Sequence, residues 1–172
     1  MKKTFLSLLT LLALTGCATN NVTFNIDEKD LNRNQSLYVM LPENGYYGAK
    51  EYKFSGNTVQ KNLVRAFQRY SVADVKASSN INSIQESLVE AKQEKIDLLI
   101  CPEITHWEDR NTPWSGIRDK VGINVRVIDV NTQQVINDAD LYGTNNWFTF
   151  VNNRPDVLVP DMIQKYTDLL YK

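Results

Sequence analysis

The sequence contains few of the residues that build most metal sites and disulfide scaffolds. It has one histidine and two cysteines among its 172 residues. Structural zinc sites use four ligands, mostly cysteine and histidine, and disulfide frameworks use several cysteine pairs, so the composition argues against both. Basic residues are not in excess either, because 19 Lys and Arg stand against 20 Asp and Glu. We therefore expect no nucleic acid partner.

The apolar stretch near the N-terminus is too short to span a bilayer comfortably. Lys2 and Lys3 precede "TFLSLLTLLA", which is followed by "LTGC" ending at Cys17. This order is typical of a secretory signal, and the final cysteine resembles a bacterial lipobox. We expect residues 1–16 to be a lipoprotein signal peptide and Cys17 to be lipidated and to hold the protein to a membrane.

The residues after Cys17 predict which membrane carries the protein. Ala18 and Thr19 lack the aspartate that resembles an inner-membrane retention signal, so we expect the outer membrane and its periplasmic face. With Cys17 acylated, Cys101 has no partner within the chain for a disulfide. We expect Cys101 to be a buried thiol in an apolar strand.

Hydrophobic periodicity predicts one domain over residues 36–172, after a polar tether over residues 17–35. Val22, Phe24 and Ile26 alternate within the tether, which leaves a short edge strand open. The domain pattern is β-α-β-α-β-β-β-α. It predicts an α/β (α+β) fold with a five-stranded mixed sheet and helices packed on it. The expected strands cover 36–42, 72–76, 97–107, 121–130 and 134–144, and the helices 57–70, 83–95 and 160–171.

Local signals support some of these boundaries. Asn57 with Gln60 and Ser83 with Glu86 have the spacing of capping boxes at the starts of the first two helices. The unbroken apolar run from Leu98 to Cys101 indicates a strand that is buried on both faces.

The topology brings three aromatic segments to one rim of the sheet. Loops that follow parallel strands emerge at one edge, where open α/β sheets usually bind ligands. Tryptophan, tyrosine and arginine are frequent interface anchors, although the same rings can simply cap the core. The candidate binding residues are Tyr46, Tyr47, Trp107, Glu108, Asp109, Arg110, Trp114 and Trp147.

No catalytic set emerges from these residues. His106 and Glu108 alternate along an extended chain and could hold a metal ion with Asp109 as a third ligand. A stable metal site usually needs three or four ligands, and only one histidine and no free cysteine lie here, so a hydrogen-bonded histidine is the favoured interpretation. Glu103 and Glu108 are candidate carboxylates for sugar hydrolysis, which needs two such groups across a cleft. Ser115 lies in "WSG" rather than in a nucleophile elbow. We expect no enzyme activity and no cofactor.

The lipobox, "YVMLPENGYYG", "HWEDRNTPWSG" and "IDVNTQQVI" together resemble a family of uncharacterised proteobacterial lipoproteins, domain-of-unknown-function family 4823. The resemblance covers about residues 36–171 and implies location and domain extent. The order of elements is also similar to that of the amino-terminal domain of the translocation protein TolB, which is an analogy of fold alone.

Three functions follow as expectations. The first is a non-catalytic module, anchored in the outer membrane, that binds an envelope protein. The alternative is a module that binds a small molecule or a glycan such as peptidoglycan, through sugars stacked on the aromatic rings. A cell-wall hydrolase is the least favoured.

Overall fold

The computed structural model describes residues 19–26, 30–110, 117–145 and 154–171. Within these residues no helix has both the length and the apolar character needed to cross a membrane. The strands are β1 (Thr19–Phe24), β2 (Leu37–Val39), β3 (Tyr46–Tyr47), β4 (Lys50–Glu51), β5 (Val75–Ala77), β6 (Leu98–Glu108), β7 (Lys120–Asp129) and β8 (Val135–Thr144). The helices are α1 (Ser55–Phe67), α2 (Ile84–Gln93), the 3-10 helix η1 (Pro155–Leu158) and α3 (Val159–Leu170).

Six strands form one mixed sheet in the order β1-β8-β7-β6-β2-β5, and β3 pairs with β4 in a separate hairpin. β2 runs parallel to β5 and β6, as the two helical crossovers require. β6, β7, β8 and β1 then pair antiparallel in turn. The α/β class is as predicted, and so is the order of the sheet strands and α-helices from β2 to α3. The β3–β4 hairpin and η1 are additions that the predicted order did not contain.

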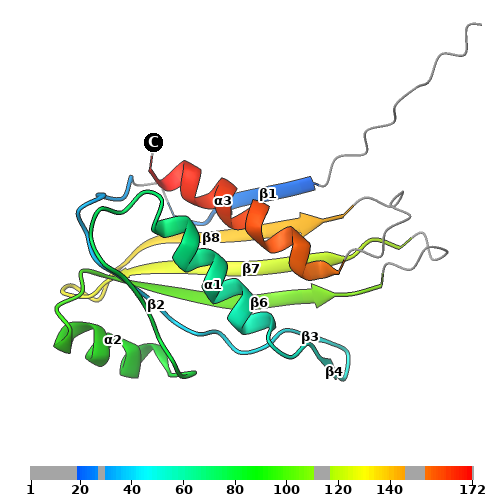
Figure 1. Cartoon of the computed structure of the whole chain (residues 1–172), viewed down its shortest axis with the longest axis horizontal. Helices are drawn as coiled ribbons and strands as arrows, with labels where there is room; N and C mark the ends of the chain where they lie inside the picture. The colour runs from blue at the N-terminus through cyan, green and yellow to red at the C-terminus, as the bar shows by residue number, and fades with distance from the viewer. Residues whose placement is uncertain (1–18, 27–29, 111–116, 146–153, 172) are drawn as a thin grey trace, which may run out of the picture.

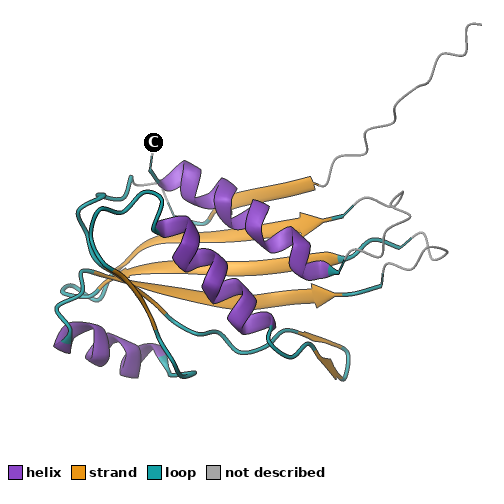
Figure 2. Cartoon of the chain, viewed as in Figure 1, coloured by secondary structure: helices purple, strands orange, loops and turns teal. Residues whose placement is uncertain are grey.

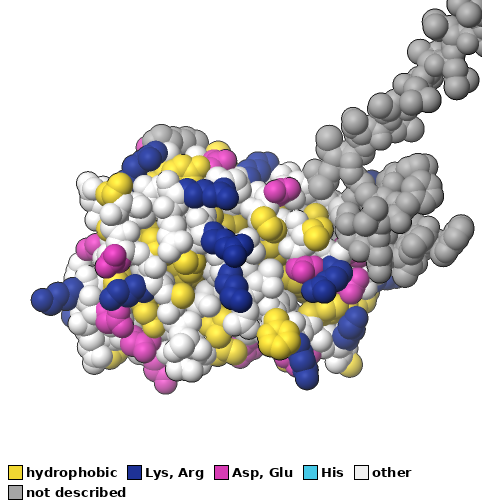
Figure 3. Space-filling view, viewed as in Figure 1, with side chains coloured by type: hydrophobic (Ala, Val, Ile, Leu, Met, Phe, Trp, Pro, Cys, Tyr) yellow, Lys and Arg dark blue, Asp and Glu magenta, His cyan; other side chains and the backbone are white. Residues whose placement is uncertain are grey.

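Helices cover the two faces of the sheet unequally. α1 and α3 lie side by side across one face (Figures 1 and 2) and bury the larger core, in which Phe67 and Tyr166 are fully inaccessible. Basic side chains gather over α1 on the outside of this layer (Figure 3). α2 covers the opposite face over Leu99 and Cys101, near the start of β6. Cys101 is a buried free thiol, as expected.

The expected count of five strands is corrected to six. Thr19–Phe24 pairs with β8 through six consecutive residues, and the side chains of Val22 and Phe24 pack on the core. Leu31 is also buried, and its N–H donates to the carbonyl of Leu170. Much of the segment expected to be a tether is therefore folded onto the domain.

The two crossover helices begin in different ways. α2 starts with the predicted capping box, in which Ser83 and Glu86 satisfy each other's backbone N–H groups. α1 starts two residues before the predicted Asn57, after Phe54, whose backbone is left-handed at φ 70°. The expected capping pair of Asn57 with Gln60 is wrong: Gln60 lies inside the helix and donates to the carbonyl of Ser78 at 2.7 Å.

Candidate functional site

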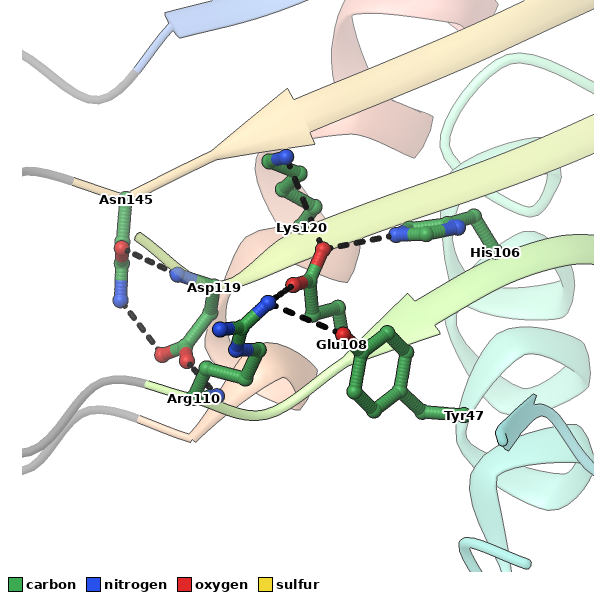
Figure 4. Close-up of polar contacts among 7 residues, drawn as sticks. All are labelled: Tyr47, His106, Glu108, Arg110, Asp119, Lys120 and Asn145. Carbon is green, nitrogen blue, oxygen red and sulfur yellow. Dashed lines mark hydrogen bonds and ion pairs between the residues drawn. The ribbon is translucent and has the colours of Figure 1, made fainter. Parts of the chain in front are cut away.

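A buried carboxylate, Glu108, organises the end of β6. Its side chain is only 4% exposed, yet three half-exposed basic side chains reach it. The Nε2 of His106 lies 3.1 Å from one carboxylate oxygen, and Nζ of Lys120 lies 3.6 Å from the same oxygen. Arg110 donates to the other oxygen at 3.0 Å. Figure 4 shows these partners converging on Glu108, with His106 on β6, Lys120 on β7 and Arg110 in the segment just after β6.

The partners of Glu108 keep it ionised. Burial by itself raises the pKa of the Glu108 carboxyl, because a charge is less stable away from water. Hydrogen bonds from His106 and Arg110, with the charge of Lys120, outweigh burial and hold the pKa below its ordinary value. A carboxylate surrounded in this way serves as a structural counter-ion, and the predicted hydrogen-bonded role of His106 is confirmed.

Arg110 links this network to the β3–β4 hairpin. Its guanidinium donates to the hydroxyl of Tyr47 at 2.9 Å and lies 5.8 Å from the centre of the Tyr47 ring. The Tyr47 ring in turn meets the His106 ring edge-on, with centroids 6.3 Å apart. The predicted convergence of the hairpin with the end of β6 is therefore confirmed for Tyr47, His106 and Arg110.

A glycine allows the hairpin to lie this close to β6. A Cβ on Gly45 would fall 2.7 Å from the Cβ of Trp107 and 2.9 Å from Cγ2 of Ile104. Any side chain at position 45 would therefore push the hairpin away from the sheet. The approach of Gly45 is what places Tyr47 within reach of Arg110.

Trp107 was expected on the rim surface, and this expectation is wrong. Its side chain is 3% exposed and belongs to the core under α1 and α3. The cause is a β-bulge between Ile104 and His106, which leaves Thr105 as an extra residue and reverses the alternation beyond it. Trp107 consequently pairs with the core residue Val121, and Glu108, also expected at the surface, is buried.

Of the other predicted rim residues, Tyr46 and Asp109 lie within the described part of the chain. Tyr46 is 57% exposed. Asp109 is partly exposed, and its carboxylate lies 3.9 Å from the ammonium group of Lys50. Cys17, Trp114 and Trp147 lie outside the described residues. Across the described parts of the chain, no group of three His, Cys, Asp or Glu side chains is placed to hold a metal ion.

A groove that the sequence did not reveal lies on the α2 side of the sheet. Its volume is about 360 Å³, near the lower end of the roughly 300–1,000 Å³ typical of ligand sites. Apolar and polar side chains share its lining, among them Met40, Asn44, Tyr46, Ile81, Ile84, Glu103 and Arg126. It is assembled from four separate segments, which is why no single motif predicts it.

Arg126 is the most distinctive group of the groove. One terminal nitrogen lies 3.4 Å from the carboxylate of Glu103, which is 63% exposed. The Nε–H of Arg126 is buried and has no hydrogen-bond partner among the residues that the structure describes. A buried donor without a partner is costly. The rest of the Arg126 guanidinium is partly exposed and can meet an acceptor oxygen in the groove.

These features define a single-domain α/β protein with a polar rim and a lateral groove. The family model for a domain of unknown function, DUF4823, matches residues 29–170. The chain therefore belongs to the DUF4823 family, as the sequence resemblance implied. No curated protein matches the sequence.

Solved structures share the fold at low sequence identity. A variant of PelC from Paraburkholderia phytofirmans, crystallised as a dodecamer, superposes with a TM-score of 0.66 at 15% identity, over 88% of this chain and 98% of PelC. A second PelC dodecamer gives 0.61 at 16% identity, over 86% and 96%. Protein XCC0632 from Xanthomonas campestris, of the DUF330 family, gives 0.52 at 12% identity, over 85% and 86%. At these identities the likeness shows the fold alone.

Proposed function

We propose that the protein is a lipoprotein, anchored through Cys17 in the outer membrane, that works in the periplasm as a non-catalytic binding module for another envelope protein. The anchor is supported by the basic start, the apolar run and the "LTGC" sequence. Acyl chains contribute about 0.8 kcal/mol for each buried methylene, so a multiply acylated Cys17 is a firm anchor.

The position of Arg126 in the lining of the groove is the observation that carries the binding role. The Arg126 side chain as a whole is 34% exposed, and a peptide carbonyl or a carboxylate entering the groove would accept a hydrogen bond from the exposed part of its guanidinium, while Met40 and Ile84 offer apolar contact. Tyr46 and Ile81, exposed by 57% and 56%, line the same groove. Aromatic and arginine side chains beside apolar ones are the usual anchors of a protein interface.

The pairing of the rim residues supports a non-catalytic role. A general acid or base needs a group that is free to exchange a proton with a substrate. Glu108 instead accepts from His106 and Arg110, and its pKa is lowered. Glu103, the other carboxylate considered for sugar hydrolysis, is mostly exposed and paired with Arg126.

Site-specific photo-crosslinking in the native envelope tests the proposal. A photoreactive residue at Ile81 lines the groove, whereas one at Val89 has similar exposure, 51%, on the outer surface of α2. We expect a discrete protein adduct from Ile81 that disappears in Arg126→Ala, and no adduct from Val89. An adduct of twice the chain mass would identify a second copy as the partner, an arrangement for which the PelC dodecamer is a precedent in the same fold. Equal adducts from both positions, or none from Ile81, would contradict the proposal.

A glycan is the second candidate for the groove. The exposed ring of Tyr46 can stack on a sugar, and Asn44 and Asn82 line the same space with groups that can meet hydroxyls. Titration with soluble peptidoglycan fragments, followed by NMR, separates the two candidates. Saturable shifts confined to the groove residues would favour the glycan, and their absence would leave the protein partner.

A further inference from the structure

The start of β1 limits the distance between the proposed lipid anchor, Cys17, and the rim. Thr19 pairs with Thr144, Thr144 with Lys120, and Lys120 with Glu108, so one row across four strands joins the first residue of β1 to the rim network. Strands lie about 4.8 Å apart, and the three spacings in this row amount to about 14 Å. Cys17 precedes Thr19 by two residues, which span at most about 7 Å. Cys17 can therefore lie no more than about 21 Å from Glu108.

The hairpin belongs to the same end of the molecule. Figure 1 shows the start of β1, the ends of β6 and β8 and the β3–β4 hairpin together, opposite the end that carries α2. The hollow between the hairpin and η1, of about 370 Å³, is lined by Lys53, Phe54 and Trp107 among others. This hollow places Phe54 beside the rim, just before α1 begins.

The exposed side chains at this end include several that favour a lipid headgroup region. Tyr47 and Phe54 are 37% and 73% exposed. Lys50, Lys53 and Arg110 lie near them as exposed cations, with Lys50 beside the carboxylate of Asp109 and Arg110 paired with Glu108. Tyrosine and other aromatic rings concentrate at membrane interfaces, and lysine and arginine are attracted to anionic headgroups. Figure 3 shows hydrophobic and charged side chains interleaved near the start of α1.

We propose that one end of the domain lies against the lipid headgroups of the membrane that holds Cys17. This end is formed by Tyr47, Lys50, Lys53, Phe54 and Arg110. This inference rests on the proposed lipidation of Cys17. The row from Thr19 to Glu108 supports it, because an anchor so close to the rim leaves little room for a folded partner between the rim and the bilayer. The groove is lined by none of the residues that form this end, so it stays accessible to a periplasmic partner.

Fluorescence quenching in vesicles tests this orientation. Phe54 and Val72 are matched positions: they are 73% and 75% exposed, and they flank the two ends of α1, which is about 20 Å long. The full-length lipidated protein is inserted into vesicles of phosphatidylethanolamine and phosphatidylglycerol that carry a headgroup spin label. One fluorophore is attached to Phe54→Cys or to Val72→Cys. The two native thiols do not compete, since Cys17 is acylated and Cys101 is buried.

We expect severalfold stronger quenching at Phe54→Cys than at Val72→Cys. Equal weak quenching, with the protein still floating with the vesicles, would overturn the orientation and leave the anchor intact. Stronger quenching at Val72→Cys would overturn it in favour of the opposite orientation. Loss of quenching at Phe54→Cys in native envelopes but not in vesicles would show a protein on this surface and overturn lipid contact. If wild type and Cys17→Ser float alike, the anchor itself is wrong and the inference falls with it.

Discussion

Asp119 and Asn145 satisfy each other's polar groups inside the protein. The backbone N–H of Asp119 donates to the side-chain oxygen of Asn145 at 2.9 Å, and the Asn145 amide donates back to the Asp119 carboxylate at 2.6 Å. Both residues are buried, and the other Asp119 carboxylate oxygen accepts from the backbone N–H of Arg110 at 2.8 Å. This pair ties the end of β8 to the start of β7 and positions the backbone of Arg110.

Replacing Asn145 with alanine should destabilise the protein by about 2–3 kcal/mol, because it removes a partner from the buried Asp119 carboxylate. Asn131→Ala is the matched control, since only the backbone N–H of Asn131 is used in its turn. We expect the control to change stability by less than about 0.5 kcal/mol. Urea denaturation followed by circular dichroism measures the free energy of unfolding of both variants. Equal losses would show that the Asp119–Asn145 pair does not stabilise the protein.

Replacing Glu108 with glutamine should cost about 1–2 kcal/mol at neutral pH through the lost charge-assisted bonds to His106 and Arg110. The pKa of Glu108 is lowered in the folded protein. Its stabilisation is therefore complete above the ordinary value of 4.5 and is lost as the pH falls through the lower folded value. The difference in the free energy of unfolding between wild type and Glu108→Gln should therefore fall toward zero over that acidic range.

Glu103→Gln serves as the control for this pH dependence. Glu103 lies on the same strand, but its side chain is 63% exposed and its ion pair with Arg126 is at the surface. Exposed pairs contribute only about 0–1 kcal/mol. A pH-independent gap for Glu108→Gln, or one no larger than that of Glu103→Gln, would contradict the role of Glu108 as a buried counter-ion.

Replacing Phe54 with glycine should stabilise the protein by about 1 kcal/mol. Phe54 has a left-handed backbone at φ 70°, which costs a residue with a Cβ roughly 1–2 kcal/mol and costs glycine nothing. Its side chain is 73% exposed, so little burial is lost. Phe54→Ala keeps the strain and should leave the melting temperature nearly unchanged. A glycine variant that melts below the alanine variant would contradict this explanation.

Cys101 should resist thiol reagents while the protein is folded. Burial raises the pKa of the Cys101 thiol to about 12, and the nearby Arg126 offsets this only in part. Labelling of the Cys17→Ser chain should therefore follow global unfolding and accelerate with urea. Val72→Cys in the same background offers an exposed thiol and should react at once. Rapid labelling of Cys101 without denaturant would show that the strand opens locally.

The sequence predicted the features that depend on local signals. The capping box at Ser83 and the burial of both faces of β6 follow from residue order alone. Both are confirmed, since Leu98 and Leu99 are fully inaccessible on opposite faces of the strand. The alternation of Val22, Phe24 and Ile26 left a short edge strand open, but the sequence could not decide its pairing with the sheet, because the partner residues in β8 lie more than a hundred positions away. The sequence did not predict the start of α1 at Ser55, because phenylalanine, here Phe54, rarely adopts a left-handed backbone.

The rim was predicted only in part because its geometry depends on one inserted residue. Regular alternation from Ile104 directs Trp107 outward, but the bulge at Thr105 turns it into the core. Gly122 allows this bulge, since a Cβ there would lie 2.7 Å from Oγ1 of Thr105. Contacts between distant segments, such as Tyr47 with Arg110, can be expected from topology but not placed by it.

The antiparallel pairing of β1 with β8 also determines how the domain bears a pulling force. Under the proposed lipidation of Cys17, a partner that draws the domain away from the membrane would load β1 from the Thr19 end, along the strand axis. The ladder hydrogen bonds run across that axis, so the six pairs from Thr19 to Phe24 share the load in shear and do not open one after another. A strand loaded in shear resists force better than one whose pairs open one after another. The proposed anchor would therefore be joined to the domain through the stronger of these two geometries.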